Sequence, residues 1–171
     1  ELVERAGKIR GGGVQPKDDN MLKVTGDGRK AALDVRLVGL SDPHNKSGKI
    51  YACARNVHRL WVDYAESKAA QIVFCDLSTP SSTAEFTAYN ELRKELVELG
   101  IPDSEIAFIH DYDSDARKDE LFQAVRRGTI RVLMGSTSKL GMGTNVQDRL
   151  IALHHLDIPW RTSDMEQREG R

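Results

Sequence analysis

Apolar and polar positions follow two different spacings between residues 49 and 75. From residue 49 to residue 64 the apolar residues fall three and four positions apart, which predicts an amphipathic helix of roughly five turns. Residues 71–75 are then almost continuously apolar, which indicates a buried strand. The apolar positions of the helix are Ile50, Cys53, Val57, Leu60, Trp61 and Tyr64. The pattern therefore begins with a helix followed by a buried strand.

The same alternation continues toward the C-terminus. We expect a helix at 86–99, a strand at 105–110, a helix at 116–127 and strands at 130–134 and 150–156. Gly100 and Gly128 follow the two helices, at the position where glycine commonly ends a helix. Strands that alternate with helices and are apolar on both faces predict a mainly parallel sheet with helices on each face. The expected fold class is therefore α/β, with three layers.

Residues 1–45 show a different pattern, dense in glycine, proline and short polar residues. These residues favour turns, so we expect loops over 7–28 with a short extended piece at 21–24. A short helix is expected over 29–38, and residues 41–48 form another break. The chain is therefore predicted to consist of an irregular, glycine-rich lead-in, 1–45, and one domain, 46–171.

Composition excludes several classes of protein. Apolar residues make up 39% and charged residues 30%, which is typical of a soluble globular domain, and the net charge of −1 gives no bulk argument for nucleic-acid binding. Cys53 and Cys75 lack the spacing of a zinc site or a disulfide framework. The sequence has no signal peptide and no apolar run of about 18 residues, so neither secretion nor membrane insertion is indicated. We expect a cytoplasmic protein.

A glycine-containing loop follows the strand predicted at 130–134. Its sequence is Ser136-Thr137-Ser138-Lys139-Leu140-Gly141-Met142-Gly143-Thr144-Asn145. Ligands of parallel α/β folds gather at the carboxyl ends of the strands, which is where this loop begins. Hydroxyl groups suit phosphate oxygens, and glycines let backbone N–H groups approach a phosphate or a ribose. A simple glycine turn capped by asparagine is the alternative interpretation.

The last predicted helix carries Gln167, Arg168 and Arg171, which can share one side. Arginines at such a position can neutralise charge on a transferring phosphoryl group. The acidic residues beside them also permit a solvated helix held by salt bridges, and the local pattern does not decide between the two interpretations. A domain is not expected to end on such a cluster, so we expect the chain to be a fragment of a larger protein.

Other patterns do not form sites. Residues 111–115 resemble the start of a calcium loop, but Ala116 and Phe122 stand where glycine and glutamate are needed, so we expect a turn and a helix N-cap. Residues 47–49 resemble the end of a phosphate-binding loop but lack its earlier glycine and its preceding strand. His154 and His155 lie on opposite faces of a strand and predict a structural role. We therefore expect no metal site.

Taken together, the motifs give a resemblance that covers residues 47–171. The stretch resembles the second RecA-like domain of superfamily-two helicases, in particular of the Snf-type DNA translocases. Residues 71–75 resemble the strand of motif IV in that family. The pattern Ser136-Thr137-x-x-x-Gly141-x-Gly143-x-Asn145 matches motif V, Asp157-x-x-Trp160 resembles the segment that follows it, and Gln167-Arg168-x-Gly170-Arg171 is similar to the first half of motif VI.

The resemblance implies a role for each motif residue. Arg171 corresponds to an arginine finger that acts on ATP bound by a partner RecA-like domain, Gln167 lies near the γ-phosphate and the attacking water, and Arg168 supports that cluster. Motif V implies contacts with both ligands. The implied nucleotide-binding residues are Gly141, Gly143 and Asn145, and the implied contacts with the DNA backbone are Ser136, Thr137, Ser138 and Lys139. Trp160 is implied to pack or to couple the two sites.

Departures from the family pattern imply what the chain lacks. The sequence has no Walker A or Walker B motif, so ATP and Mg²⁺ are expected to be bound mainly by an N-terminal RecA-like domain of the same protein. A second arginine finger is expected three residues past Arg171. The implied partners are that domain and DNA, double-stranded and contacted through its backbone, and no membrane. We expect the fragment alone not to hydrolyse ATP.

The beginning of the chain carries a narrower resemblance. Residues 25–34 are similar to a subgroup found on phages and conjugative elements, where an adenine-type DNA methylase is fused to such a helicase. This implies the cytoplasm of a bacterial host. A methyltransferase-like domain that binds S-adenosylmethionine is an alternative, although residues 75–78 lack the glycines it needs. A non-catalytic interaction domain that kept the motor fold is another.

Overall fold

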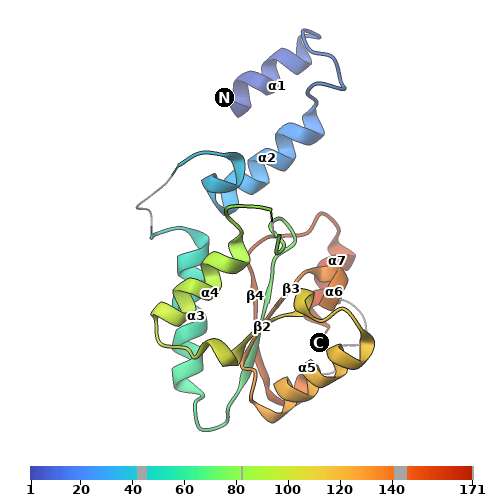
Figure 1. Cartoon of the computed structure of the whole chain (residues 1–171). Helices are drawn as coiled ribbons and strands as arrows, with labels where there is room; N and C mark the ends of the chain where they lie inside the picture. The colour runs from blue at the N-terminus through green and yellow to red at the C-terminus, as the bar shows by residue number, and fades with distance from the viewer. Residues whose placement is uncertain (42–45, 82, 141–145, 171) are drawn as a thin grey trace. The chain divides into compact units, whose positions relative to one another are not determined.

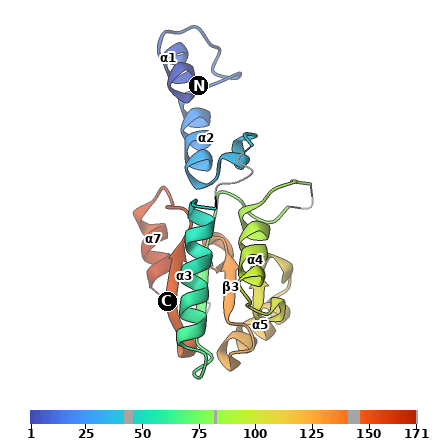
Figure 2. The same ribbon diagram turned by 90° about the vertical axis from the view of Figure 1, so that its left-hand side faces the viewer.

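The computed structural model describes residues 1–41, 46–81, 83–140 and 146–170. The chain falls into two compact units, Glu1–Asn45 and Lys46–Arg171, which we describe separately. Figures 1 and 2 show both units from two directions.

The second unit is built on a sheet of four parallel strands in the order β2-β3-β1-β4. The strands are β1 (Ala70–Phe74), β2 (Ile106–Phe108), β3 (Val132–Gly135) and β4 (Leu150–His155). All the residues of β1 are buried, as the continuous apolar run predicts for a central strand. The predicted strands are confirmed, and β2 is shorter than expected because a 3₁₀ turn, η3 (Ile109–Asp111), follows it.

Helices cover both faces of the sheet (Figure 1). One face carries α3 (Lys49–Asp63) and α4 (Ala88–Glu98), and the other carries α5 (Asp115–Arg127), α6 (Thr137–Leu140) and α7 (Thr162–Glu169). The predicted three-layer α/β fold is confirmed. The further elements of the second unit are the 3₁₀ turns η2 (Asp103–Glu105) and η4 (Gln147–Arg149).

The period of two along β1 divides the core between the two faces. Ile72 and Phe74 belong to a buried cluster with Leu121 of α5 and Leu133 of β3. On the other face the amide of Gln71 donates to the carbonyl of Val57 in α3 at 2.9 Å, and its oxygen lies 2.9 Å from Nε2 of His154. Both polar groups of this buried glutamine are therefore satisfied, one of them by His154.

Local signals explain where the predicted helices begin and end. The hydroxyl of Thr87 accepts a hydrogen bond from the N–H of Asn90 and caps α4, and Ser114 caps α5 in the same way. Gly128 ends α5 with a φ of +74°, and a Cβ at this position would lie 2.6 Å from Cβ of Lys68. Glycine is therefore required there by both its backbone conformation and its neighbour.

The first unit is more helical than predicted. Helices occupy α1 (Leu2–Arg10) and α2 (Met21–Leu33), followed by η1 (Val35–Val38). The loop expected over 7–28 is therefore wrong at 7–10 and 21–28, as is the extended piece at 21–24, whereas residues 11–20 lie between the helices in turns, as predicted. Asn20 starts α2 by accepting from the N–H of Lys23 at 3.0 Å. Arg5 of α1 pairs with Asp19 at 2.8 Å and Asp27 at 2.9 Å.

These contacts explain why the glycine signal misled. Each glycine inside a helix costs about 1 kcal/mol relative to alanine, and α2 continues through Gly26 and Gly28 because its cap and its partners outweigh that cost. The glycine run 11–13 does end α1, as turn chemistry predicts. Across the described ranges of the chain, no helix combines the length and the apolar character that crossing a bilayer requires.

Candidate nucleic-acid and nucleotide site

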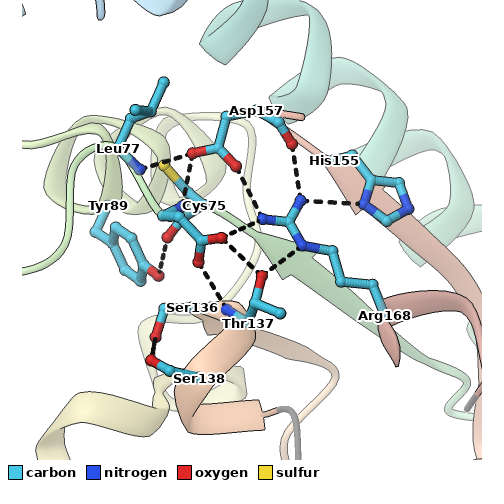
Figure 3. Close-up of polar contacts among 10 residues, drawn as sticks. Cys75, Leu77, Tyr89, Ser136, Thr137, Ser138, His155, Asp157 and Arg168 are labelled. Carbon is cyan, nitrogen blue, oxygen red and sulfur yellow. Dashed lines mark hydrogen bonds and ion pairs between the residues drawn. The ribbon is translucent and has the colours of Figure 1, made fainter. Parts of the chain in front are cut away.

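Three parallel strands end at one edge of the sheet, and a polar residue follows each of them. Asp76 lies two positions after β1, Thr137 begins α6 directly beyond β3, and Asp157 lies two positions after β4. Carboxyl ends of parallel strands meet at the same edge, so the topology brings these three side chains together. Figure 3 shows Thr137 and Asp157 of this group around Arg168.

Arg168 of α7 joins the three residues. Its side chain is fully buried, and its Nε donates to the hydroxyl of Thr137 at 2.7 Å. Nη2 donates to Oδ2 of Asp76 at 2.7 Å and to Oδ1 of Asp157 at 3.0 Å, while Nη1 donates to the carbonyl of Asp157 at 2.7 Å. The guanidinium lies over the ring of Phe74, 5.2 Å from its centroid. The buried cation is therefore paired with charge and with hydrogen bonds.

Asp76 holds the start of α6. Its Oδ1 accepts from the backbone N–H of Thr137 and its Oδ2 from the Thr137 hydroxyl, both at 2.7 Å. Burial alone would raise the pKa of Asp76, but the hydrogen bonds from Thr137 and Arg168 outweigh it and lower the pKa below its ordinary value. The carboxylate therefore stays charged opposite Arg168.

Asp157 and His155 complete the cluster. Oδ2 of Asp157 accepts from the backbone N–H groups of Asp76 at 2.6 Å and Leu77 at 2.7 Å, which fixes the segment after β1. The ring of His155 stacks on Phe74 with centroids 5.8 Å apart. Burial, and then the charge of Arg168, lower the pKa of His155. Because its pKa is lowered, the imidazole of His155 is neutral at pH 7 beside the guanidinium of Arg168.

A groove of about 520 Å³ opens beside this cluster. Its walls come from the segment after β1, η3, the end of the β3–α6 connection with helix α6, and helix α7. The lining residues are Asp76, Thr79, His110, Ser136, Thr137, Ser138, Lys139, Asp164 and Gln167. The groove therefore brings together the predicted hydroxyl-rich loop and the predicted Gln/Arg helix.

The predicted contacts with the DNA backbone divide into two pairs. Ser138 and Lys139 are exposed, whereas Ser136 and Thr137 are buried. The hydroxyl of Thr137 donates to Asp76 and accepts from Arg168, so in this structure its donor is already used inside the domain. Gln167 is exposed and lines the groove.

Other predicted residues fall elsewhere. Gly141, Gly143, Asn145 and Arg171 lie outside the described residues. Trp160 is 65% exposed in the segment after β4. Arg168, predicted as part of the catalytic cluster, makes the polar contacts above within the domain, and its catalytic role stays a prediction.

Asp76, Asp157 and His110 were given no site role from the sequence. Asp76 and Asp157 were visible as acidic residues directly after predicted strands, which is a signal for a site in this kind of fold. His110 ends a predicted strand in the same way. Which of them face each other depends on the strand order, and periodicity does not specify that order.

Gly135 determines how closely α6 and η3 pack against the carboxyl end of β3. It is the last residue of β3, and a Cβ there would lie 2.6 Å from Cγ of Leu140 in α6 and 2.8 Å from Cγ2 of Ile109 in η3. The absence of a side chain therefore allows α6 and η3 to pack against the end of the strand.

Comparison with known proteins assigns the family. A search of the curated proteins found no match. Among solved structures, the DUF1998 helicase MrfA, in a crystal structure bound to DNA, is similar with a TM-score of 0.46 and 16% identity, over 67% of this chain and 15% of that chain. The model of the helicase conserved C-terminal domain matches residues 53–171, more than half of the sequence. This chain therefore belongs to the family of helicase conserved C-terminal domains.

Proposed function

We propose that residues 46–171 are the second RecA-like motor domain of an ATP-dependent DNA helicase or translocase of superfamily two, of the Snf type. The observation that carries the proposal is the buried Arg168, which ties α7 to α6 and to the segment after β1. The helix that resembles motif VI is thereby bonded to the loop that resembles motif V. Coupling between ATP and DNA requires such a connection.

The DNA side of the proposed function rests on the groove. Ser138 and Lys139 are exposed on its wall, and a hydroxyl and an ammonium group suit the oxygens of a phosphodiester. Contacts with the backbone position a protein on DNA without reading its sequence. Thr137 acts in this proposal by positioning α6, because its hydroxyl already bonds Asp76 and Arg168.

The nucleotide side rests on Gln167 and on residues outside the described ranges. An amide oxygen or N–H at Gln167 can orient a water or a phosphate oxygen, and Arg171 follows four residues later in the sequence. Mg²⁺ prefers clustered oxygen ligands, and the described residues contain no group of three or more His, Cys, Asp or Glu able to hold a metal. We therefore assign ATP and Mg²⁺ mainly to a first RecA-like domain, where the metal would neutralise phosphate charge.

The bonds of Arg168 to Thr137 and Asp76 also suggest how nucleotide binding is coupled to DNA contact. A movement of α7 toward a nucleotide displaces Arg168, and Arg168 is bonded to both Thr137 and Asp76. Because the guanidinium is buried, these bonds do not exchange readily with water. The start of α6, and with it Ser138 and Lys139, is expected to move with α7 in a cycle of domain closure and reopening.

The proposed function is tested by DNA-stimulated ATP hydrolysis in the helicase chain that contains this domain. Arg171→Ala should lower kcat by about 10³-fold or more while ATP binding persists, because an arginine finger acts on the transition state. Lys94→Ala, on the opposite face of the sheet, is the control and should change nothing. Unchanged turnover in Arg171→Ala would remove the finger assignment, and steady hydrolysis by the present chain alone would contradict the expected division of labour.

The kind of genetic element that encodes this protein is a separate proposal. Residues 25–34, now seen as part of α2 and the residue that caps its end, support a protein from a phage or conjugative element that fuses a DNA methylase to the motor. Its test is the flanking gene sequence, where a methylase motif and a Walker A lysine are expected upstream. A flanking sequence without the Walker lysine would favour an interaction domain that kept the motor fold.

A further inference from the structure

His155 supplies the last acceptor around the buried guanidinium of Arg168. A guanidinium carries five N–H donors and no acceptor. Four of them point at other groups: the hydroxyl of Thr137, the carbonyl and the carboxylate of Asp157, and the carboxylate of Asp76. Nη1 also lies 3.4 Å from Nδ1 of His155, which is the partner that the described residues leave for its second N–H. Because the side chain of Arg168 is fully buried, bulk water does not reach this N–H.

The sheet holds the ring of His155 in this orientation. His155 of β4 and Phe74 of β1 are partners in the register of the two strands. Their rings stack with centroids 5.8 Å apart and an interplanar angle of 9°. The guanidinium of Arg168 lies over the Phe74 ring as well, 5.2 Å from its centroid. The imidazole is therefore positioned by the strands, and the guanidinium is positioned against it.

The hydrogen bond determines where the ring carries its proton. Because a guanidinium only donates, Nδ1 of His155 must accept, and a neutral imidazole then has its proton on Nε2. Burial, and then the charge of Arg168, lower the pKa of His155, and the opposing effects of Glu169 and Asp157 are smaller. The neutral ring that accepts from Arg168 is therefore the form present at pH 7.

We propose that His155 is a positioning residue for Arg168, and that protonation of its ring weakens the coupling between the nucleotide side and the DNA side of the domain. The inference rests on the proposed function and adds to it a regulation by pH. His155 does not line the groove, and it acts only through the guanidinium that ties α7 to α6.

Protonation of His155 changes two interactions at once. It fills the lone pair of Nδ1, so a buried N–H of Arg168 loses its acceptor. It also places a second positive charge on the ring whose Nδ1 lies 3.4 Å from the guanidinium nitrogen. Both changes act on the one side chain that bonds α6 and the segment after β1 from α7.

The charged groups around the ring do not replace the lost acceptor. Asp157, after β4, and Asp76, after β1, already accept from other N–H groups of Arg168. Glu169 follows Arg168 on α7 and is exposed, so its charge favours the protonated ring without serving the guanidinium. Burial lowers the pKa of His154 to about 4, so its ring stays neutral down to about pH 5.

The direction of the pH effect follows from the lowered pKa of His155. In the folded domain the ring takes up its proton as pH falls through a pKa below the ordinary value of about 6.5. The unfolded chain takes up the same proton at higher pH. The contribution of the neutral ring to stability is therefore complete above about pH 6.5 and is lost as pH falls from there through the folded pKa.

The experiment measures ATP hydrolysis by the longer protein that contains this domain, with and without duplex DNA, from about pH 8 to about pH 5. The ratio of the two rates reports coupling. In the parent this ratio should fall as pH drops below about 6.5. His155→Asn keeps an acceptor near the place of Nδ1 and does not titrate. Its ratio should match that of the parent at pH 8 and exceed it at pH 5.

Two further variants separate the acceptor from the ring. His155→Phe keeps an aromatic ring against Phe74 and removes the acceptor, so the ratio should be lower by about ten-fold at pH 8 and should lack the acid step. His58→Asn is the matched control, since His58 lies on α3 against Trp61 and makes no printed contact with Arg168. Its pH profile should follow that of the parent.

Nitrogen-15 NMR of the His155 ring in the present chain tests the hydrogen bond without any motor activity. Above about pH 7, Nδ1 should be unprotonated and Nε2 protonated, and the ring should titrate below its ordinary range. A proton on Nδ1 would overturn the inference, because that nitrogen could not then accept from Arg168.

The outcomes distinguish this inference from the proposed function. The parental loss at low pH in His155→Asn would overturn the regulation by pH, and the parental ratio in His155→Phe would overturn the positioning role. In both cases stimulation of the parent by DNA leaves the proposed function standing. Equal losses in the two His155 variants at pH 8 would assign the ring a packing role and also overturn the inference. A parent that DNA does not stimulate at any pH would overturn the proposed function, and the inference with it.

Discussion

Two arginines are buried among the described residues, at opposite edges of the same sheet. Arg131 precedes β3 at the amino edge, where its Nε donates to the carbonyl of Ala69 at 3.1 Å and its Nη2 to the carbonyls of Trp61 at 2.7 Å and Tyr64 at 3.2 Å. Arg168 lies at the carboxyl edge, where carboxylates and a hydroxyl surround it.

The difference lies in what holds each cation. Arg131 bonds backbone carbonyls and lies over the ring of Trp61, with the carboxylate of Glu105 only at 3.9 Å. Burial lowers the pKa of Arg131, and Glu105 partly offsets the shift. Backbone groups cannot move without unfolding the segment, so Arg131 is a fixed connection. Arg168 bonds two carboxylates, a hydroxyl and one carbonyl after separate strands, so it ties together segments that are far apart in the sequence.

The largest effect is expected from Arg168→Met. Asp76 and Asp157 would then share a partly buried site without a cation, and breaking a buried ion pair typically costs about 3–5 kcal/mol. The free energy of unfolding in urea measures the loss. Arg168→Lys keeps the charge but not the bidentate geometry and should lie between the parent and Met. A loss below about 1 kcal/mol in the Met variant would remove the distinction drawn between the two arginines, since the cost of leaving two carboxylates without their cation would be absent.

Arg131→Met should destabilise less, by about 1–3 kcal/mol, because it leaves neutral carbonyls without donors rather than carboxylates without a cation. Urea unfolding again gives the value. On the proposed function, the longer protein that contains this domain should retain DNA-stimulated ATP hydrolysis in this variant at a temperature where it stays folded. Loss of stimulation there would show that the amino edge also takes part in coupling.

The smallest effect is expected from Asp76→Asn and depends on pH. The hydrogen bonds from Thr137 and Arg168 keep the pKa of Asp76 below its unfolded value of about 3.9, so its contribution is complete above that pH and declines as pH falls through the folded pKa. The variant should be about 1–2 kcal/mol less stable at pH 7. The gap should narrow below about pH 4.

Denaturation from pH 7 to pH 3 measures this gap. Asp113→Asn, at a side chain that is 83% exposed, is the matched control and should show little change at any pH. A gap for Asp76→Asn that stays constant over the whole range would mean that its charge is not what holds α6.

The predictable part of the molecule is the part encoded locally. The helix α3 and the strand β1 follow from apolar spacing, and the end of α5 follows from Gly128. The helices within residues 1–45 are not evident from local patterns, because Gly26 and Gly28 favour a turn, whereas the cap at Asn20 and the pairing of Arg5 with Asp27 stabilise the helix. The ion pairs of Arg5 join residues that lie far apart in the sequence, which no local pattern reports.

The residues of the candidate site likewise fall into those that local sequence indicates and those that only the strand order reveals. Residues 136–139 and Gln167 were singled out from their own sequence and line one groove, although the loop predicted to begin at Ser136 forms the short helix α6 over Thr137–Leu140. Asp76 and His110 emerged only with the strand order, since the bond between Arg168 and Asp76 joins positions 92 residues apart. Whether a particular acid or imidazole faces the groove depends on which strand ends are neighbours. The sequence pattern establishes that strands exist and leaves their order open.

Gly135 gives the groove a property that its polar residues do not determine. A methyl group at this position would push Leu140 of α6 away from Ile109 of η3. Both elements line the groove, α6 through Lys139 and η3 through His110. The distance between these two walls, and hence the width of the groove, is therefore limited by a residue that does not itself line the groove.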